Sequence, residues 1–167
     1  MAINFCPQRA VSELHLIDIE NLLGKPSFTS NAVADLRPVY DTVSAASTPA
    51  HYLIGTSAVQ NLVEAGHGWG QGQLVFSKGK DGAERAILAE VTLATASRYG
   101  RVIIGSGDGI FADLAASLQS EGIEVRVVSR RRSLSKALSL AVKDKRFLPE
   151  PDLSAIAGIL SAVSVGW

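Results

Sequence analysis

Three aspartates, Asp18, Asp81 and Asp108, stand where an α/β protein would carry out chemistry. Asp18 and Asp108 each follow a short apolar run of strand length, and Asp81 precedes a segment with helical periodicity. Ligands of open α/β sheets bind beyond the carboxyl ends of parallel strands, so functional acids are expected there. Two carboxylates about 4 Å apart repel by roughly 4 kcal/mol at an effective dielectric constant near 20. If the three acids converge, they therefore predict a bound cation.

The expected cluster offers oxygen ligands. Glu84 lies one helical turn after the second aspartate, and Asp113 lies in the helix that follows the third. Oxygen ligands without His or Cys favour Mg²⁺ or Mn²⁺ over zinc. His15 and His51 have no carboxylate or histidine neighbours at ligand spacing, so we assign them structural roles.

Each acid also has a purely structural explanation. Asp81, followed three residues later by Glu84, fits a helix capping box. Asp108 could cap the helix that begins at Gly109, and Asp18 could form a side-chain turn after its strand. These alternatives stay open for each acid taken singly, whereas convergence of all three at one sheet edge would favour a functional site.

Strand-like and helix-like segments alternate along the chain and must position these acids. The expected strands cover residues 13–19, 51–56, 73–77, 101–105 and 124–129. A helix is expected over residues 31–46, interrupted near Pro38, and a shorter one over 57–64. The glycine-rich stretch 66–72 predicts a flexible connection, with a stacking platform made by Trp69 as the alternative. The pattern predicts a three-layer α/β/α fold with a mainly parallel, five-stranded sheet.

Composition limits the domain organisation. With 167 residues, 47% of them hydrophobic, the chain is long enough for one domain with a substantial core. We expect that domain over residues 1–148 and an apolar tail over 149–167, helical and packed on the domain or on a partner. A homodimer is compatible with this tail, whose large apolar residues are Leu153, Ile156, Ile159, Leu160 and Val163.

Net charge bears on which partners the protein can bind, and cysteine content bears on the cellular compartment. Sixteen basic and sixteen acidic residues give no net charge, so only a local patch could attract nucleic acid, and no membrane partner is expected. The single cysteine, Cys6, excludes an internal disulfide. Without a signal peptide or a membrane-spanning apolar run, the sequence predicts a cytoplasmic protein.

One segment departs from this charge balance. Residues 126–146 carry eight of the sixteen basic residues and one acid, Asp144. Basic side chains after the fifth strand would lie at the same sheet edge as the acids, where they could hold an RNA backbone or form an ordinary solvated helix face. The candidate nucleic-acid contacts are Lys78, Lys80, Arg130, Arg131, Arg132 and Lys136.

Four segments stand out together in this order: Leu-Ile-Asp-Ile-Glu-Asn-Leu at 16–22, Lys-Gly-Lys-Asp-Gly-Ala-Glu at 78–84, Ile-Gly-Ser-Gly-Asp-Gly-Ile-Phe at 104–111 and Gly-Ile-Glu-Val-Arg-Val-Val at 122–128. Across residues 12–130 the chain thereby resembles the NYN family of PIN-like nuclease domains. The resemblance matches Asp18 and Asn21 to the family's Asp-x-x-Asn motif, Asp81 to its second acid and Asp108 to its Ser-Gly-Asp motif.

The resemblance implies a Mg²⁺- or Mn²⁺-dependent ribonuclease. Asp18, Asp81 and Asp108, with Glu84 or Asp113, would hold the metal, and Asn21 would orient a ligand or the phosphate. Many family members carry a second aspartate where this chain has Ile110, which questions a two-metal site more than metal binding itself.

Two other readings remain open. One is a catalytically weak PIN-like domain that binds and regulates RNA or a protein. The other is a phosphatase similar to the haloacid dehalogenase family, suggested by Gly-Asp-Gly-Ile-Phe-Ala-Asp at 107–113, although that family needs an aspartate where this chain has Glu20. A toxin in a toxin–antitoxin pair would use the same ribonuclease chemistry.

Overall fold

The computed structural model describes residues 12–150, so Cys6 and the tail residues 151–167 lie outside the described part. Six strands form the sheet: β1 (Glu13–Asp18), β2 (Ala50–Thr56), β3 (Gln73–Phe76), β4 (Arg101–Gly105), β5 (Glu124–Ser129) and β6 (Asp144–Phe147). The helices are α1 (Ile19–Leu23), α2 (Ser30–Ser44), α3 (Val59–Trp69), α4 (Gly82–Glu90), α5 (Leu93–Ala96), α6 (Ala112–Ser120) and α7 (Lys136–Ala141).

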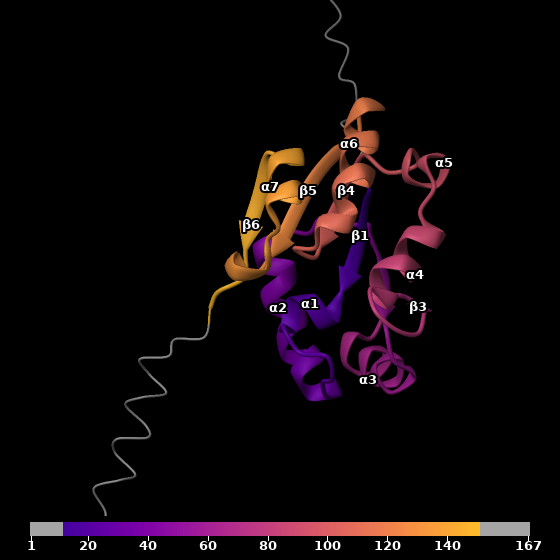
Figure 1. Ribbon diagram of the computed structural model, residues 1–167, viewed down its shortest axis with the longest axis vertical. Coiled ribbons are helices and arrows are strands. Elements are labelled where there is room, and N and C mark those ends of the chain that lie inside the picture. Colours follow the sequence, from indigo (N-terminus) through magenta and orange to yellow (C-terminus); the bar gives the residue numbers. More distant parts are fainter. Residues whose placement is uncertain (1–11, 151–167) are drawn as a thin grey trace, which may run out of the picture.

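All neighbouring strands are parallel, in the order β3-β2-β1-β4-β5-β6. In Figure 1, β6, β5, β4 and β1 follow one another from left to right. The order reverses between β1 and β4, where Ile17 pairs with Gly105. The predicted three-layer fold is confirmed with one correction, because the sheet has a sixth strand, β6. Its sequence, Asp-Lys-Arg-Phe, is short and charged, as is common for an exposed edge strand, and so resembles a solvated segment of the basic run.

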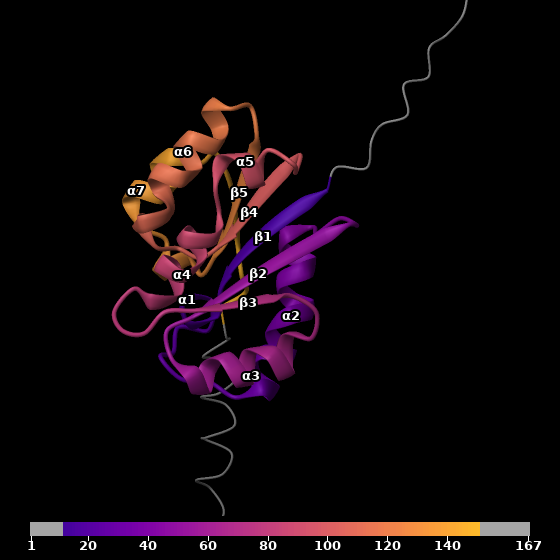
Figure 2. The same cartoon turned by 90° about the vertical axis from the view of Figure 1, so that its right-hand side faces the viewer.

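Helices cover both faces of the sheet, which explains why the central strands are apolar on both sides. The two helical layers are separated by the sheet in Figure 2, with α2 and α3 on one side and α4 to α7 on the other. Leu14 and Leu16 of β1 face the α4 to α7 layer, whereas His15 and Ile17 face the α2 layer. This alternation is the two-residue period of a strand buried on both sides.

Two sequence expectations about helices are wrong. Helix α2 runs without a break through Pro38, because the buried residues Val33, Leu36 and Tyr40 on either side of it anchor one continuous face. Helix α3 extends to Trp69 and absorbs much of the expected glycine-rich loop. A Cβ on Gly68 would clash with the Ser30 carbonyl oxygen, so this glycine permits close packing of α3 on α2.

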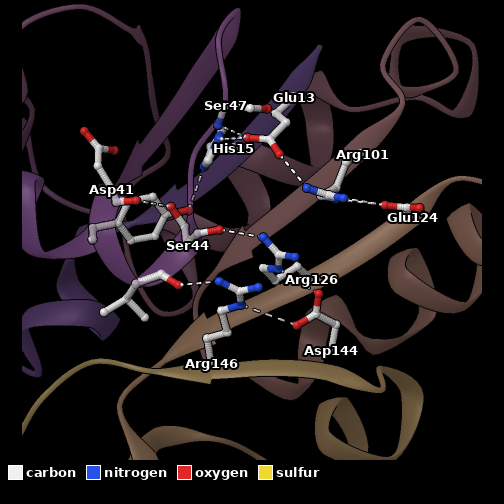
Figure 3. Close-up of polar contacts among 12 residues, drawn as sticks. Glu13, His15, Asp41, Ser44, Ser47, Arg101, Glu124, Arg126, Asp144 and Arg146 are labelled. Carbon is white, nitrogen blue, oxygen red and sulfur yellow. Dashed lines mark hydrogen bonds and ion pairs between the residues drawn. The ribbon is translucent and has the colours of Figure 1, made fainter. Parts of the chain in front are cut away.

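Charged residues at the amino ends of the strands form a paired network (Figure 3). Arg101 of β4 lies between two acids of neighbouring strands, 2.9 Å from Glu13 and 2.7 Å from Glu124. His15 is a structural residue, as expected: its Nδ1 lies 3.0 Å from the Tyr40 hydroxyl. It does, however, have a carboxylate neighbour, because Glu13, two residues earlier on the same strand face, lies 3.3 Å from its Nε2.

Candidate metal centre

The carboxyl ends of β1 and β4 bring two of the predicted acids to one place. Asp18 is the last residue of β1, and Asp108 follows β4 in the loop that leads to α6. These two strands are adjacent and parallel at the point where the strand order reverses, so their carboxyl ends lie side by side. The predicted convergence of the strand ends is confirmed.

Helix α4 brings two further acids, and a glycine lets it approach. Asp18 pairs with Gly55 of β2, and a Cβ on Gly55 would lie 2.5 Å from the Ala83 carbonyl oxygen. The first turn of α4 therefore lies directly on β2 beside the end of β1. This packing places Asp81 and Glu84, which begin the helix, at the same sheet edge as Asp18.

Three carboxylates meet there within ligand distance of a single ion. Asp81, Glu84 and Asp108 each offer an oxygen, and these atoms all lie within 4.8 Å of one another. Asp81 is exposed, Asp108 is partly exposed and Glu84 is buried, so the group forms a site open to solvent on one side. The donor set consists of carboxylate oxygens and fits Mg²⁺ or Mn²⁺.

Asp81 has an unusual backbone conformation for a residue other than glycine, with φ of 53°. It occupies the N-cap position of α4, yet its side chain makes no capping hydrogen bond, which contradicts the capping-box alternative. Its carboxylate is therefore left to the cluster. Arg85 holds the loop before it, because its guanidinium donates to the carbonyl oxygens of Lys78, at 3.0 Å, and Lys80.

Asp18 lies next to this group but is enclosed. One of its oxygens accepts a hydrogen bond from the backbone amide of Asn21, and the other accepts one from the Ser106 hydroxyl, both at 3.1 Å. Burial, and then the charge of Glu84, raises the pKa of Asp18 to about 8. Burial also raises the pKa of Glu84, with a further contribution from Asp108. The raised pKa values of Asp18 and Glu84 favour their protonated forms, and a cation bound beside them would oppose this shift.

The loop after β4 is fixed by side chains from both strands. Asn21 accepts a hydrogen bond of 2.9 Å from the Gly107 amide through its side-chain oxygen. Asp108 accepts one of 2.9 Å from the Ile110 amide, so it caps the short turn Gly109–Phe111. The structural interpretations of Asp18 and Asp108 are thus confirmed as well. For Asp108, capping and membership of the cluster coexist.

Sequence reasoning missed three supporting residues. Besides Ser106 and Arg85, Glu20 joins the ends of β1 and β2, since its carboxylate accepts hydrogen bonds from Ser57, at 2.8 and 2.6 Å, and from Asn61, at 2.7 Å. A polar residue two positions after a buried strand was the available signal for Glu20. Its partner Asn61, 41 residues away, could not be read from the sequence.

The remaining candidate residues lie around the cluster. Asp113 is exposed in the first turn of α6 and does not belong to the group of three ligating acids found among residues 12–150. Arg130 follows the carboxyl end of β5, and Arg131 stacks 4.3 Å from the centre of the Phe147 ring. The backbone amide of Ser135, just before Lys136, donates a hydrogen bond to the Gly107 carbonyl oxygen at 2.8 Å. The basic segment and the Asp108 loop are therefore packed together.

Comparison with known families decides the relationship. The family model described as NYN domain matches residues 16–150, a span that includes every acid of the cluster. The chain belongs to the NYN domain family. This confirms the resemblance seen in the motifs and relates the chain to the PIN-like nuclease superfamily.

The fold of this NYN domain also occurs in a solved structure. The crystal structure of a protein of unknown function from Vibrio parahaemolyticus superposes with a TM-score of 0.57 at 20% sequence identity. The match covers 90% of this chain and 98% of the other. No curated protein matches the sequence. At this identity the likeness concerns the fold.

The NYN domain contains, within residues 12–150, no helix that is both long and apolar enough to cross a membrane.

Proposed function

We propose that this NYN domain is a divalent-metal-dependent ribonuclease that hydrolyses RNA phosphodiester bonds. The observation that carries the proposal is the meeting of Asp81, Glu84 and Asp108 within 4.8 Å at the strand-order reversal. Like charges this close repel each other, and none of the ion pairs of the described residues involves these three acids. A divalent cation is the counter-charge that such a site requires.

Asp81, Glu84 and Asp108 would hold Mg²⁺ or Mn²⁺, with Asp18 beside them. A bound divalent ion supplies two things, neutralisation of phosphate charge and a water of lowered pKa. The chain itself fixes the orientation of the ligands: Ser106 and Asn21 hold Asp18 and the Asp108 loop, and Arg85 holds the loop before Asp81. Asn21 is thus a positioning residue in this proposal.

RNA would bind to basic residues on the segments that carry or contact the acids. Lys78 and Lys80 are exposed in the loop that presents Asp81, and Lys136 is exposed on the segment packed against the Asp108 loop. Together with the cations at 130–132, they would neutralise backbone phosphates. Such contacts make binding fall steeply as salt is added.

The alternatives differ in how well the geometry fits them. A binding-only PIN-like domain is favoured by Ile110, which is 38% exposed at the position where many relatives carry an acid. The phosphatase reading requires a free carboxylate at position 20. Both carboxylate oxygens of Glu20 instead accept hydrogen bonds, from Ser57 and Asn61.

The test is cleavage of an end-labelled pool of single-stranded and hairpin RNA with Mn²⁺ or Mg²⁺. Asp108→Asn keeps a capping side chain and removes a ligand charge, so we expect cleavage to fall by more than about 100-fold. Glu121→Gln, an exposed acid at the end of α6, serves as the matched control and should cleave normally. EDTA should stop cleavage by the native protein and by Glu121→Gln.

Two results would contradict the proposal. One is cleavage that persists in EDTA, and the other is full activity of Asp108→Asn. Salt-dependent RNA binding without any cleavage would instead favour the binding-only domain.

A further inference from the structure

A largely apolar groove of about 600 Å³ lies between α1, α2 and the chain that leaves β6. Figure 1 shows these three segments together at one end of the molecule. Its floor and walls include Leu22, Leu23, Leu36, Val39 and Leu148. Val39 is 37% exposed, so an apolar side chain of the α2 wall is open to solvent in the groove.

The described chain ends at the rim of this groove. Leu148 is buried and donates its amide to the Ser129 carbonyl oxygen at 3.0 Å, so the start of the exit path is fixed. Pro149 and Glu150 line the groove directly. Seventeen residues follow, and from Leu153 to the end none of them is charged. A charge-free segment of this composition gains from burial.

We propose that residues 153–163 dock in this groove of their own chain. Their large apolar residues, Leu153, Ile156, Ile159, Leu160 and Val163, recur at the three- and four-residue spacing of an amphipathic helix. An eleven-residue helix is about 16 Å long. The α2 wall from Ala32 to Val39 covers roughly 10 Å, so about two turns of such a helix would lie along it.

The short connection favours the same chain over a second copy. Leu153 is three residues beyond Glu150, a span of about 10 Å at most. A segment tethered so closely meets its own groove at an effective concentration in the millimolar range. The rim is charged, with Asp35, Arg130 and Arg132, and Arg132 is 3.9 Å from Glu150. This proposal does not depend on ribonuclease activity.

Hydrogen exchange of the full chain tests the docking. Amides of residues 153–163 should exchange at least about tenfold more slowly than in a synthetic peptide of residues 151–167. Val39→Glu puts a charge in the groove at an already exposed position, so it should bring these amides to within about twofold of the peptide rate. Val63→Glu, at a 47% exposed position of α3 away from the groove, should leave the protection intact.

A second variant, in the tail, controls for the case in which Val39→Glu unfolds the domain. Ile156→Glu alters the tail alone, and it should speed exchange of the α2 amides around Leu36 while the β1 and β4 amides stay protected. Peptide-like exchange of the tail in the native chain would overturn the proposal, as would protection that survives both charge substitutions. Protection that rises with protein concentration, together with a dimer in sedimentation, would assign the groove to a second copy and overturn it too.

Discussion

The two ends of the sheet use buried charge in opposite ways. At the amino end, Glu13 is fully buried and lies 2.9 Å from Arg101 (Figure 3). At the carboxyl end, Asp18 and Glu84 are buried and lie beside further acids. Burial acts to raise the pKa of all three residues. Hydrogen bonds from Ser47, then the charge of His15 and a hydrogen bond from Arg101, reverse this effect for Glu13 and lower its pKa overall.

This difference distinguishes a structural charge network from a ligand site. A buried acid with a cationic partner contributes to a closed, satisfied network. Buried acids that face other acids repel each other when they are ionised, and the cation that we propose for this site would relieve that repulsion. The first arrangement supports the end of α2, and the second is the site at which we propose metal-dependent chemistry.

Glu13→Gln would break the charge network at the amino end of the sheet. It removes the buried partner of Arg101, so we expect the free energy of unfolding to fall by about 3 kcal/mol. Urea denaturation without divalent ions measures this, with Glu121→Gln as the control. A loss below about 0.5 kcal/mol would mean that the network is not stabilising.

Gly55→Ala would disturb the acid cluster at the carboxyl end of the sheet by changing how α4 packs on β2. The added methyl group would meet the Ala83 carbonyl oxygen, so we expect a loss of about 2 kcal/mol and a displaced α4. Because α4 carries Asp81 and Glu84, Mn²⁺ affinity measured by calorimetry should fall as well. Unchanged Mn²⁺ affinity in the folded variant would show that α4 does not set the cluster geometry.

The pH dependence of stability should differ between the ends. The pKa of Asp18 is raised to about 8, so its native form keeps a proton that the unfolded chain loses near pH 4. Its contribution to stability is therefore complete below pH 4 and is lost as the pH rises to about 8. The pKa of His15 is lowered to about 4, so its effect is the reverse: stability is lost as the pH falls from 6.5 to 4.

Between pH 6.5 and 8 the effect of Asp18 is separated from that of His15. Metal-free protein should lose about 1 to 2 kcal/mol of stability over this window, and Asp18→Asn should lose much less. Thermal melts in EDTA across the window provide the measurement. Equal slopes for the native protein and the variant would remove Asp18 as the source.

Glu84→Gln sharpens the contrast with Glu13→Gln. It removes one charge from a repulsive group, so metal-free stability should rise by about 1 kcal/mol instead of falling. The same variant should lose most of the melting-temperature increase produced by Mn²⁺. Destabilisation in EDTA would contradict the view that the acids repel.

Arg85→Ala should have the smallest effect. Arg85 is exposed and holds backbone carbonyls of the loop before Asp81, so we expect Mn²⁺ affinity to fall by about threefold, less than for most outer-shell residues. Arg98→Ala, an exposed arginine after α5, is the control in the same titration.

Local sequence patterns predicted most elements because strand and helix periodicities are local properties. They failed where tertiary packing outweighed a local signal. Pro38 continues a helix because buried residues on both sides anchor it, and Gly68 ends up at a helix contact. The sixth strand, β6, escaped detection because a charged edge strand lacks the apolar pattern of a central one.

The same division holds for the site. The sequence by itself determined which acids lie at strand ends and helix starts, since a motif such as Ser-Gly-Asp after an apolar run is read locally. Tertiary structure decided which of them meet: the register of Asp18 with Gly55 and the approach of α4 bring Glu84 into the group, whereas Asp113 stays exposed outside it. Distances between segments far apart in the chain depend on packing, which no local pattern encodes.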